Sequence, residues 1–353
     1  MKITKVSFEH HSLELKNPYT IAYETIKSAS NFFLQIETDG KIVGLGCAAP
    51  DKEVTGESAE ETTSVIQTLI IPFLTGKNPL NYVQILTELK ILLPKSPSVL
   101  AMVDMALFDI FAKKAQVPLY QFLGGFRHEI ATSITVGILP MKETLYEVKE
   151  FVNQGFHIIK IKGGLNVDED IERVNQVHQK YPKLILRFDG NQGFNKKETI
   201  KFVKETTHVG IEILEQPTKT HKRKKLGKIT RQVDIPVMAD ESIKSLADAF
   251  HLAKNSIINM INIKLMKVGG IQEAKHINSV AKSGKIEVMV GCLDESALGI
   301  SAGLHFALSR PNIEYADLDG HLDFINDPVK NIFILEKGIL RPNHEYGLGL
   351  KSF

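Results

Sequence analysis

His157-Ile158-Ile159-Lys160-Ile161-Lys162-Gly163-Gly164 is a short run in which lysines alternate with isoleucines before two glycines. Successive side chains of a β-strand point to opposite faces, so Lys160 and Lys162 are predicted to share one face. Two ammonium groups at that spacing repel each other, which favours a lowered pKa in one of them. A lysine with a lowered pKa can act as a base near neutral pH. Taken alone, the pattern is typical of a solvated edge strand, so its meaning depends on the rest of the chain.

Short apolar runs recur on both sides of this stretch, and segments of helical period lie between them. Strands that alternate with helices imply a parallel sheet, and eight such units close into a barrel. An open, doubly wound sheet is the alternative, but no Gly-x-Gly-x-x-Gly turn opens any unit, so nothing favours a dinucleotide site. The predicted strands are Ala131–Gly137, His157–Lys162, Leu184–Asp189, Ile211–Glu215, Ile235–Asp240, Ile261–Leu265, Ile286–Val290 and Ile313–Asp317.

The first part of the chain has a different pattern, which predicts a small antiparallel sheet followed by helices. The predicted strands are Lys2–Glu9, Asn31–Thr38 and Lys41–Cys47, and the predicted helices are Ser58–Leu74, Tyr82–Leu92 and Val99–Lys114. Between the first two strands, Leu15–Ser30 is polar without clear periodicity, which indicates a surface loop or a lid over a site. The glycine pair at Gly124-Gly125 is a natural boundary, so residues 1–124 are predicted to form an α+β module.

The composition is that of a globular protein without a strong charge bias. The chain has 353 residues, is 43% hydrophobic and 24% charged, and carries a formal net charge of +2, which indicates no bulk polyanion partner. Its two cysteines, Cys47 and Cys292, form no disulfide or zinc pattern, and no apolar run is long enough to span a bilayer. We therefore expect a soluble, cytoplasmic protein. The basic run His221–Lys225 could bind nucleic acid, but a solvated helix face is the favoured interpretation.

Charged residues stand at the predicted C-terminal ends of the strands, where a barrel carries its chemistry. Asp189, Glu215 and Asp240 end three consecutive predicted strands. A single acid before a turn is typical of a helix cap, but three on adjacent strands converge on one axis. Three carboxylates together are unfavourable unless a cation neutralises them. Oxygen ligands without His or Cys favour Mg²⁺, with calcium or manganese as less suitable ions. Lys264 lies on the next strand, Asp317 ends the last strand and Asp319 follows it.

At these residues the chain resembles the enolase superfamily, its muconate-lactonising-enzyme subgroup and, most closely, dipeptide epimerases of the L-Ala-D/L-Glu type. The resemblance covers essentially the whole chain. It implies an α/β fold in which residues 125–319 form a (β/α)7β modified TIM barrel. This barrel would carry the active site. Residues 1–124 would form a capping domain with a substrate lid, and residues 320–353 would pack back on the cap.

The resemblance also implies the roles of individual residues. One Mg²⁺ ion per subunit would be bound by Asp189, Glu215 and Asp240. Lys162 and Lys264 would be the catalytic bases, which act on opposite faces of the α-carbon through an enediolate. Other residues would bind the substrate. Lys160 would face the substrate carboxylate, and Asp317 and Asp319 would hold the α-ammonium group. Thr135 and Asp294 would line the pocket.

The implied activity is epimerisation of the C-terminal residue of an L-Ala-Xaa-type dipeptide. The alternatives are a muconate cycloisomerase or an o-succinylbenzoate synthase of the same subgroup, whose substrates have no ammonium group for Asp317 and Asp319. Members that act on Glu have an arginine in the lid, where this chain has Glu24, a substrate-binding candidate that would repel a Glu side chain. Tyr19 and Tyr23 would favour neutral or apolar side chains. A homo-oligomer without membrane or nucleic-acid partners is expected, and a non-enzymatic barrel that binds peptides or nucleic acid is the remaining alternative.

Overall fold

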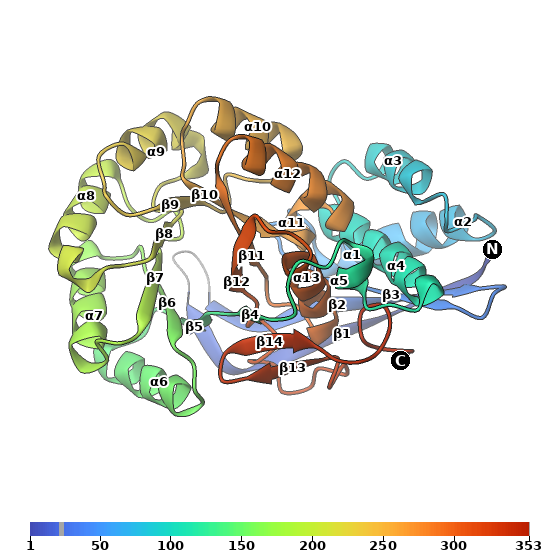
Figure 1. The fold of residues 1–353 in the computed structure, drawn as a ribbon, viewed down its shortest axis with the longest axis horizontal. Coiled ribbons are helices and arrows are strands. Elements are labelled where there is room, and N and C mark those ends of the chain that lie inside the picture. The colour runs from blue at the N-terminus through green and yellow to red at the C-terminus, as the bar shows by residue number, and fades with distance from the viewer. Residues whose placement is uncertain (21–24, 353) are drawn as a thin grey trace.

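The N-terminal part of the protein is an antiparallel sheet covered by helices (Figure 1). The structure, a computed structural model, describes residues 1–20 and 25–352, with the side chains of all of these except 17–20 and 25. The sheet has the order β1-β2-β3, with β1 at Ile3–Thr20, β2 at Thr25–Thr38 and β3 at Val43–Ala48. The helical segments are α1 (Ala59–Val65), a π-helical turn (Ile66–Ile70), α2 (Ile71–Leu74), α3 (Tyr82–Leu92), α4 (Pro97–Ala115) and α5 (Leu119–Phe122).

Helix α4 is the central helix of this part because nearly its whole circumference is apolar and buried. It packs closely on β3, where Gly44 and Gly46 leave room for the helix backbone. A Cβ at Gly46 would lie only 1.9 Å from the carbonyl oxygen of Met102. The apolar pattern of α4 therefore fixes how the sheet and the helices come together.

The expectation of a loop over Leu15–Ser30 is wrong for most of that segment. Strand β1 continues to Thr20 and β2 begins at Thr25. The two strands pair at Glu14↔Ser28 and, after a register shift, at Tyr19↔Ile26 and Thr20↔Thr25. Leu13 and Leu15 are buried against Phe324, which lies more than three hundred residues later in the chain. This distant apolar partner explains why local periodicity gave no sign of the strands.

The second part is a parallel eight-stranded barrel, which confirms the predicted fold class. Its strands follow one another in chain order from β5 to β12 (Figure 1). A bridge between Thr132 and Ala316 joins the two ends of the sheet. The strands are β5 (Ile134–Val136), β6 (Ile158–Lys162), β7 (Ile185–Asp189), β8 (Ile213–Glu215), β9 (Val237–Ala239), β10 (Met260–Lys264), β11 (Glu287–Gly291) and β12 (Ile313–Asp317).

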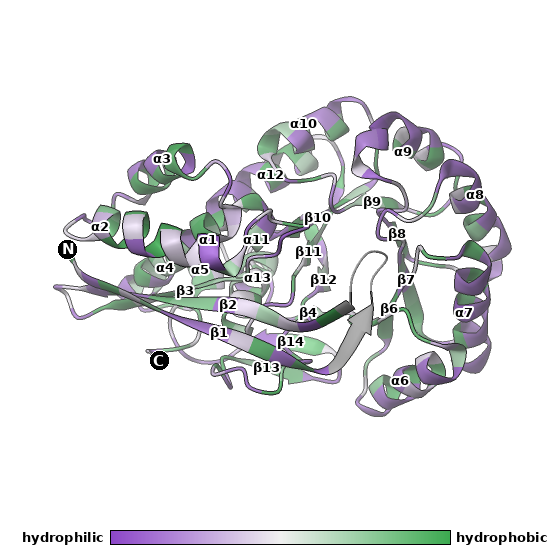
Figure 2. Ribbon diagram, turned by 180° about the vertical axis from the view of Figure 1, so that it is seen from behind, coloured by the Kyte–Doolittle hydropathy of each residue, from purple (hydrophilic) through white to green (hydrophobic). Residues whose placement is uncertain are grey.

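Helices surround this barrel, and those of its outer ring have polar outward faces, most visibly α7 and α8 (Figure 2). The helices are α6 (Met141–Asn153), α7 (Val167–Lys180), α8 (Lys196–Glu205), α9 (Arg223–Thr230), α10 (Leu246–Lys254), α11 (Leu265–Val268), α12 (Ile271–Ser283) and α13 (Ala297–Leu308). Helix α13 is buried along its whole length. None of the helices in the described part of the chain is both long and apolar enough to cross a membrane.

One predicted strand, Ala131–Gly137, proves to be two. Strand β4 (Ile130–Ala131) pairs with β14 (Ile339–Pro342) outside the barrel, whereas β5 pairs with β6 inside it. The chain changes sheet at Thr132 and Ser133, whose amides donate to the carbonyls of Gly338 and Ala316. The other barrel strands lie close to their predicted ranges.

The C-terminal segment contacts both parts of the molecule. Strand β13 (Phe333–Glu336) pairs with β14, and β14 pairs with β4 beside the barrel. Further on, the Leu348 amide donates to Asp109 Oδ1 on α4 at 2.8 Å, and the Leu119 amide donates to the carbonyl of Gly347. The division of the chain into domains at 124 and 319 remains a prediction.

Candidate active site

A cavity of about 660 Å³ opens at the C-terminal ends of the barrel strands. Ile26 of β2 also lines it, so the N-terminal sheet contributes to its wall. Of the predicted site residues, those that line the cavity are Thr135, Lys160, Lys162, Asp189, Asp240, Lys264, Asp294, Asp317 and Asp319. Glu215 is not among the lining residues, although it ends the strand between those of Asp189 and Asp240. Glu24, Tyr23 and the side chain of Tyr19 lie outside the described residues.

The two lysines of β6 share one face of the strand, as predicted, and both reach the cavity. The glycines that follow let the strand end close to its neighbours. Gly164 has φ +107°, and a Cβ there would lie 2.2 Å from the carbonyl oxygen of Gly190. The Gly164 amide donates to Asp170 Oδ2 at 2.8 Å, which anchors the start of α7 beneath the strand end. The glycine pair therefore has a packing role beside the catalytic candidates.

The pKa of Lys160 is raised by its surroundings, which agrees with the cationic role predicted for this residue. Burial disfavours the charged form of Lys160, but Asp317, Glu215 and Asp189 outweigh that effect and raise its pKa. Lys160 Nζ forms a buried ion pair with Asp317. Carboxylates around the strand ends therefore dominate over repulsion between the two ammonium groups.

Two of the three candidate metal ligands are held by amide side chains. Asp189 Oδ1 and Oδ2 accept from the backbone amide and the Nδ2 of Asn191 at 2.9 and 3.1 Å. Glu215 Oε1 accepts from Asn262 Nδ2 at 2.7 Å. The side chain of Asn262 fits only because residue 291 is a glycine. A Cβ on Gly291 would lie 2.5 Å from Asn262 Oδ1. Burial raises the pKa of both Asp189 and Glu215. The Asp240 carboxylate raises both pKa values further, and Asp189 also raises that of Glu215.

The third candidate ligand, Asp240, is bound by lysines on both sides. Lys264 Nζ lies 2.8 Å from Asp240 Oδ2, and the fully buried Lys267 donates to Oδ1. Burial alone would raise the pKa of Asp240, but these two cations hold it below its ordinary value. Burial also opposes the charged form of Lys264, yet Asp240 and Glu215 raise its pKa well above the usual range.

The donor chemistry fits a hard divalent cation, although the side chains are not closed around one. Within residues 1–20 and 25–352, no group of three or more His, Cys, Asp and Glu side chains is arranged as a metal site. Both carboxylate oxygens of Asp240 are instead paired with lysines in this structure. Asn191 Oδ1 and Glu241 Oε2 are buried oxygens without a hydrogen-bond partner in the described structure, and both residues line the cavity. Carboxylate and amide oxygens of this kind suit Mg²⁺-like ions.

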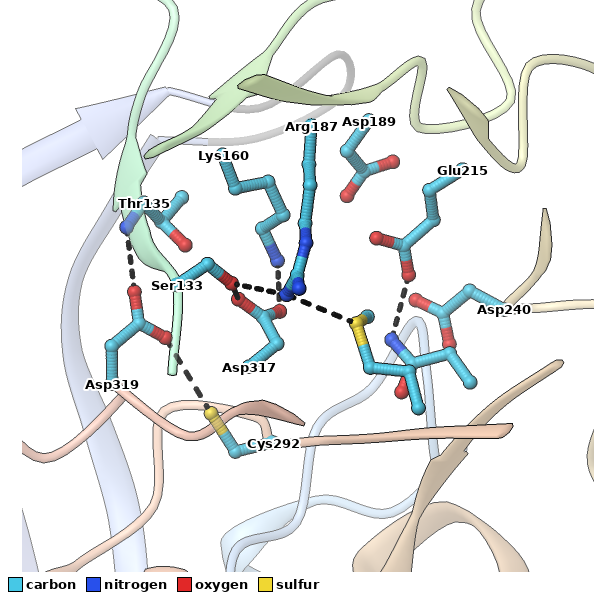
Figure 3. A network of polar contacts seen from close by, with 12 residues as sticks. Ser133, Thr135, Lys160, Arg187, Asp189, Glu215, Asp240, Cys292, Asp317 and Asp319 are labelled. Atoms are coloured by element: carbon cyan, nitrogen blue, oxygen red, sulfur yellow. Dashed lines mark hydrogen bonds and ion pairs between the residues drawn. The ribbon is translucent and has the colours of Figure 1, made fainter. Parts of the chain in front are cut away.

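Asp317 and Asp319 lie away from the candidate ligands Glu215 and Asp240 (Figure 3). Asp317 accepts from Ser133 Oγ at 2.7 Å and pairs with Lys160, while Asp319 Oδ2 accepts from the Thr135 amide at 2.7 Å. Beneath them, the buried Arg187 donates to Ser133 Oγ and to the carbonyl of Ala316. Lys160 lowers the pKa of Asp317 against the effect of burial, whereas burial and Asp317 raise the pKa of Asp319.

Arg187, Ser133 and Asn262 support the site but were not identified from the sequence. Arg187 lies two residues before Asp189 on the same strand, so alternation places both side chains on the barrel interior. The alternation in the sequence could therefore have placed Arg187 inside the barrel. Ser133 and Asn262 are small polar residues of common type, and their role is visible only from their partners.

The order of the strands places the two candidate bases apart. Lys162 ends β6 and Lys264 ends β10, and these strands are four apart in the eight-stranded barrel. In a closed barrel of eight strands that separation is half the circumference, so the two side chains enter the cavity from opposite sides. The strands that end in Asp189 and Glu215 lie between them, and Asp240 follows the third.

Comparison with known proteins agrees with this fold and this arrangement of strand ends. The mandelate racemase/muconate lactonizing enzyme N-terminal domain family matches residues 3–124, and the enolase C-terminal domain-like family matches residues 143–352. The chain therefore belongs to the mandelate racemase/muconate lactonizing enzyme family of enolase-like barrels.

Three relatives illustrate the range of this family. The L-Lys-D/L-Arg epimerase of Desulforapulum autotrophicum is 40% identical over 353 residues, which cover 99% of each chain. The L-Ala-D/L-Glu epimerase of Bacillus subtilis, solved as a substrate-liganded complex, has a TM-score of 0.96 at 34% identity, covering 99% of this chain and 98% of the other. The dipeptide epimerase of Enterococcus faecalis, solved with Mg and L-Leu-L-Tyr, has a TM-score of 0.96 at 36% identity with full coverage of both.

Proposed function

We propose that the protein is a Mg²⁺-dependent dipeptide epimerase that uses two lysines. The observation that carries this proposal is the placement of Lys162 and Lys264 on opposite sides of one cavity. Membership of the family supports the class of reaction, since the three relatives are named as epimerases or were solved with a dipeptide.

Each lysine would work on one face of the substrate α-carbon. One lysine, in its neutral form, removes the α-proton, and the other, as an ammonium group, returns a proton to the opposite face and inverts the centre. Lys160 supplies positive charge beside the substrate carboxylate, where negative charge grows as the proton leaves. Mg²⁺ bound by Asp189, Glu215 and Asp240 would add a second positive charge at the same carboxylate.

Asp319 favours a dipeptide over the other substrates of the subgroup. Its Oδ2 accepts from the Thr135 amide, and the residue is only partly buried, so it can also meet a ligand. A free α-ammonium group is a suitable partner, and the substrates of a cycloisomerase or an o-succinylbenzoate synthase have none. Membership of the family does not identify the side chain at the inverted α-carbon. The three relatives are named for different dipeptides or were solved with different ones.

The test is α-proton exchange in D2O, followed by NMR over a library of dipeptides with Mg²⁺ present. We expect exchange and inversion with at least one dipeptide, and loss of inversion in both Lys162→Ala and Lys264→Ala. Lys282→Ala is the matched control, because this lysine is exposed on α12 away from the cavity. Inversion that persists in either cavity variant would contradict the two-base scheme, and no exchange with any dipeptide would contradict the function.

A further inference from the structure

One side of the cavity is acidic. Three glutamates of α6 line it, at positions i, i+4 and i+7 on one helix face, and so do two aspartates that follow β11 and β12. We name these residues the acidic wall: Glu143, Glu147, Glu150, Asp294 and Asp323. The basic residues among the described lining are Lys160, Lys162 and Lys264, which all stand at the strand ends instead.

The acidic wall carries negative charge that the described chain neutralises only in part. None of Glu143, Glu147 and Asp323 forms an ion pair within the described residues. Burial and the nearby carboxylates of Asp319, Asp294 and Glu147 raise the pKa of Asp323 to about 7. The positive charge of Lys16 lowers the pKa of Asp323. Lys16 Nζ donates to the carbonyl of Leu322 at 2.8 Å.

Asp319 connects the acidic wall to the reacting part of the cavity. Asp319 lies close enough to Asp323 to raise the pKa of that residue. On its other side, the nearby carboxylate is Asp317, which raises the pKa of Asp319. In the proposed function Asp319 holds the α-ammonium group of the substrate. The side chain of the N-terminal residue leaves from the same carbon as that ammonium group, so it starts beside Asp319 and extends along the acidic wall.

We propose that the acidic wall binds a cationic side chain on the N-terminal residue of the dipeptide, so that the enzyme selects lysyl or arginyl dipeptides. This inference rests on the proposed function and adds the substrate class to it. A cation gains attraction from several carboxylates at once, whereas an acidic side chain is repelled and a neutral one leaves the carboxylates to water.

The first experiment compares two dipeptides that differ in a single terminal ammonium group. L-Lys-L-Ala and L-norleucyl-L-Ala have side chains of similar length, but only the first ends in an ammonium group. We expect kcat/KM for α-proton exchange at pH 8 to be at least about tenfold higher with L-Lys-L-Ala, and this ratio to fall as salt is added. L-Ala-L-Lys and L-Ala-L-norleucine form the matching pair for the C-terminal residue, where we expect the smaller charge effect.

The second experiment removes the charge of the wall. The double variant Glu147→Gln/Asp323→Asn is expected to reduce the lysyl-to-norleucyl ratio to about threefold or less. Glu172→Gln, on α7 and outside the cavity lining, serves as the control and should leave the ratio unchanged. Circular dichroism confirms that the double variant is folded, and Glu147→Lys provides an independent test because it should shift the preference toward L-Glu-L-Ala.

The outcomes separate this inference from the proposed function. Exchange that is as fast with L-norleucyl-L-Ala as with L-Lys-L-Ala would overturn the cationic preference while leaving the epimerase in place. If only the C-terminal residue of the dipeptide showed a preference for a cationic side chain, the acidic wall would not be the site for the N-terminal side chain. A lack of exchange with every dipeptide would instead contradict the proposed function itself.

Discussion

Asp317 and Asp319 are two positions apart but have different surroundings. Both carboxylate oxygens of Asp317 meet protein groups, Ser133 Oγ and Lys160 Nζ, and the residue is 1% exposed. Asp319 has the Thr135 amide and a long contact with Cys292 Sγ at 3.8 Å, and it is only partly buried. We infer that Asp319 meets the substrate directly, while Asp317 keeps Lys160 in place.

Asp319→Asn tests this division. The change removes the negative charge opposite the substrate ammonium group, so we expect kcat/KM for a free dipeptide to fall about a hundredfold. An N-acetylated dipeptide has no ammonium group, so its slower turnover should change much less. Both rates come from α-proton exchange by NMR. Glu314→Gln, an exposed neighbour on β12, should leave both rates as they are. Equal losses with the free and the acetylated substrate would argue against an ammonium contact.

Arg187 lies within the barrel and is 4% exposed. It donates to Glu212 Oε2 at 2.7 Å as well as to Ser133 and Ala316. Arg187→Met removes the buried hydrogen bonds to Glu212, Ser133 and Ala316, so we expect the free energy of unfolding in urea to fall by about 3 kcal/mol. Arg341→Met breaks an exposed pair with Glu129 and should cost about 0.5 kcal/mol or less. Similar losses for the two variants would show that Arg187 is not a structural link below Asp317.

Helix α13 packs on α5 through a buried histidine. The Tyr120 amide donates to His305 Nδ1 at 3.0 Å, and burial lowers the pKa of His305 from 6.5 to about 3. The ring stays neutral in the folded protein, but in the unfolded chain it takes up a proton near pH 6.5. Because the unfolded state binds more protons below that pH, this residue reduces the free energy of unfolding as the pH falls from 6.5 toward 3.

His305→Asn should remove this pH dependence, because the Asn oxygen can accept from the Tyr120 amide without titrating. Between pH 6.5 and pH 5 we expect wild type to lose about 2 kcal/mol relative to the variant, measured by urea unfolding at both pH values. His344→Asn, at an exposed position, is the control. A constant difference between wild type and His305→Asn over this range would contradict the assignment.

Elements with their own periodicity could be predicted from the sequence, and elements defined by distant partners could not. The alternation of lysine and isoleucine in β6 placed Lys160 and Lys162 correctly on one face. The ends of β1 and β2 were missed because their apolar partner, Phe324, comes from the other end of the chain. The three glutamates of α6 were also missed, since an acidic face at helical spacing is typical of a solvated helix. Only the cavity beside them gives that face a candidate role.

At the scale of the whole molecule, burial of three carboxylates makes the barrel sensitive to a cation. We expect Mg²⁺ to raise the melting temperature, because an ion that binds only the folded state stabilises it by mass action. Asp189→Asn and Glu215→Gln should each reduce that increase, while Glu205→Gln, on the exposed end of α8, should not. Thermal denaturation with Mg²⁺ and with EDTA measures the effect. An unchanged melting temperature in wild type would contradict a metal site at these residues.

The alternation of eight strand patterns with helical patterns predicted the barrel, but the contacts between its parts are long-range. The sequence indicated eight strands and the residues at their ends, and these define most of the cavity floor. The electrostatic balance was not predictable, because the pKa of Lys160 depends on Asp317, from a strand that lies far along the chain. The same holds for the acidic wall, which combines α6 with the segments after β11 and β12.

The hairpin of β1 and β2 is held to the segment after β12 by the Lys16 amide, which donates to the carbonyl of Asp323 at 2.7 Å, and by a bridge between Leu15 and Phe324. These partners are more than three hundred residues apart in the sequence, so the ribosome makes Lys16 long before Asp323. This part of β1 therefore has no such partner until the segment after β12 has been translated. The described residues that line the cavity all precede residue 324, so a chain cut before Phe324 would keep them but would leave Leu13 and Leu15 without their apolar partner.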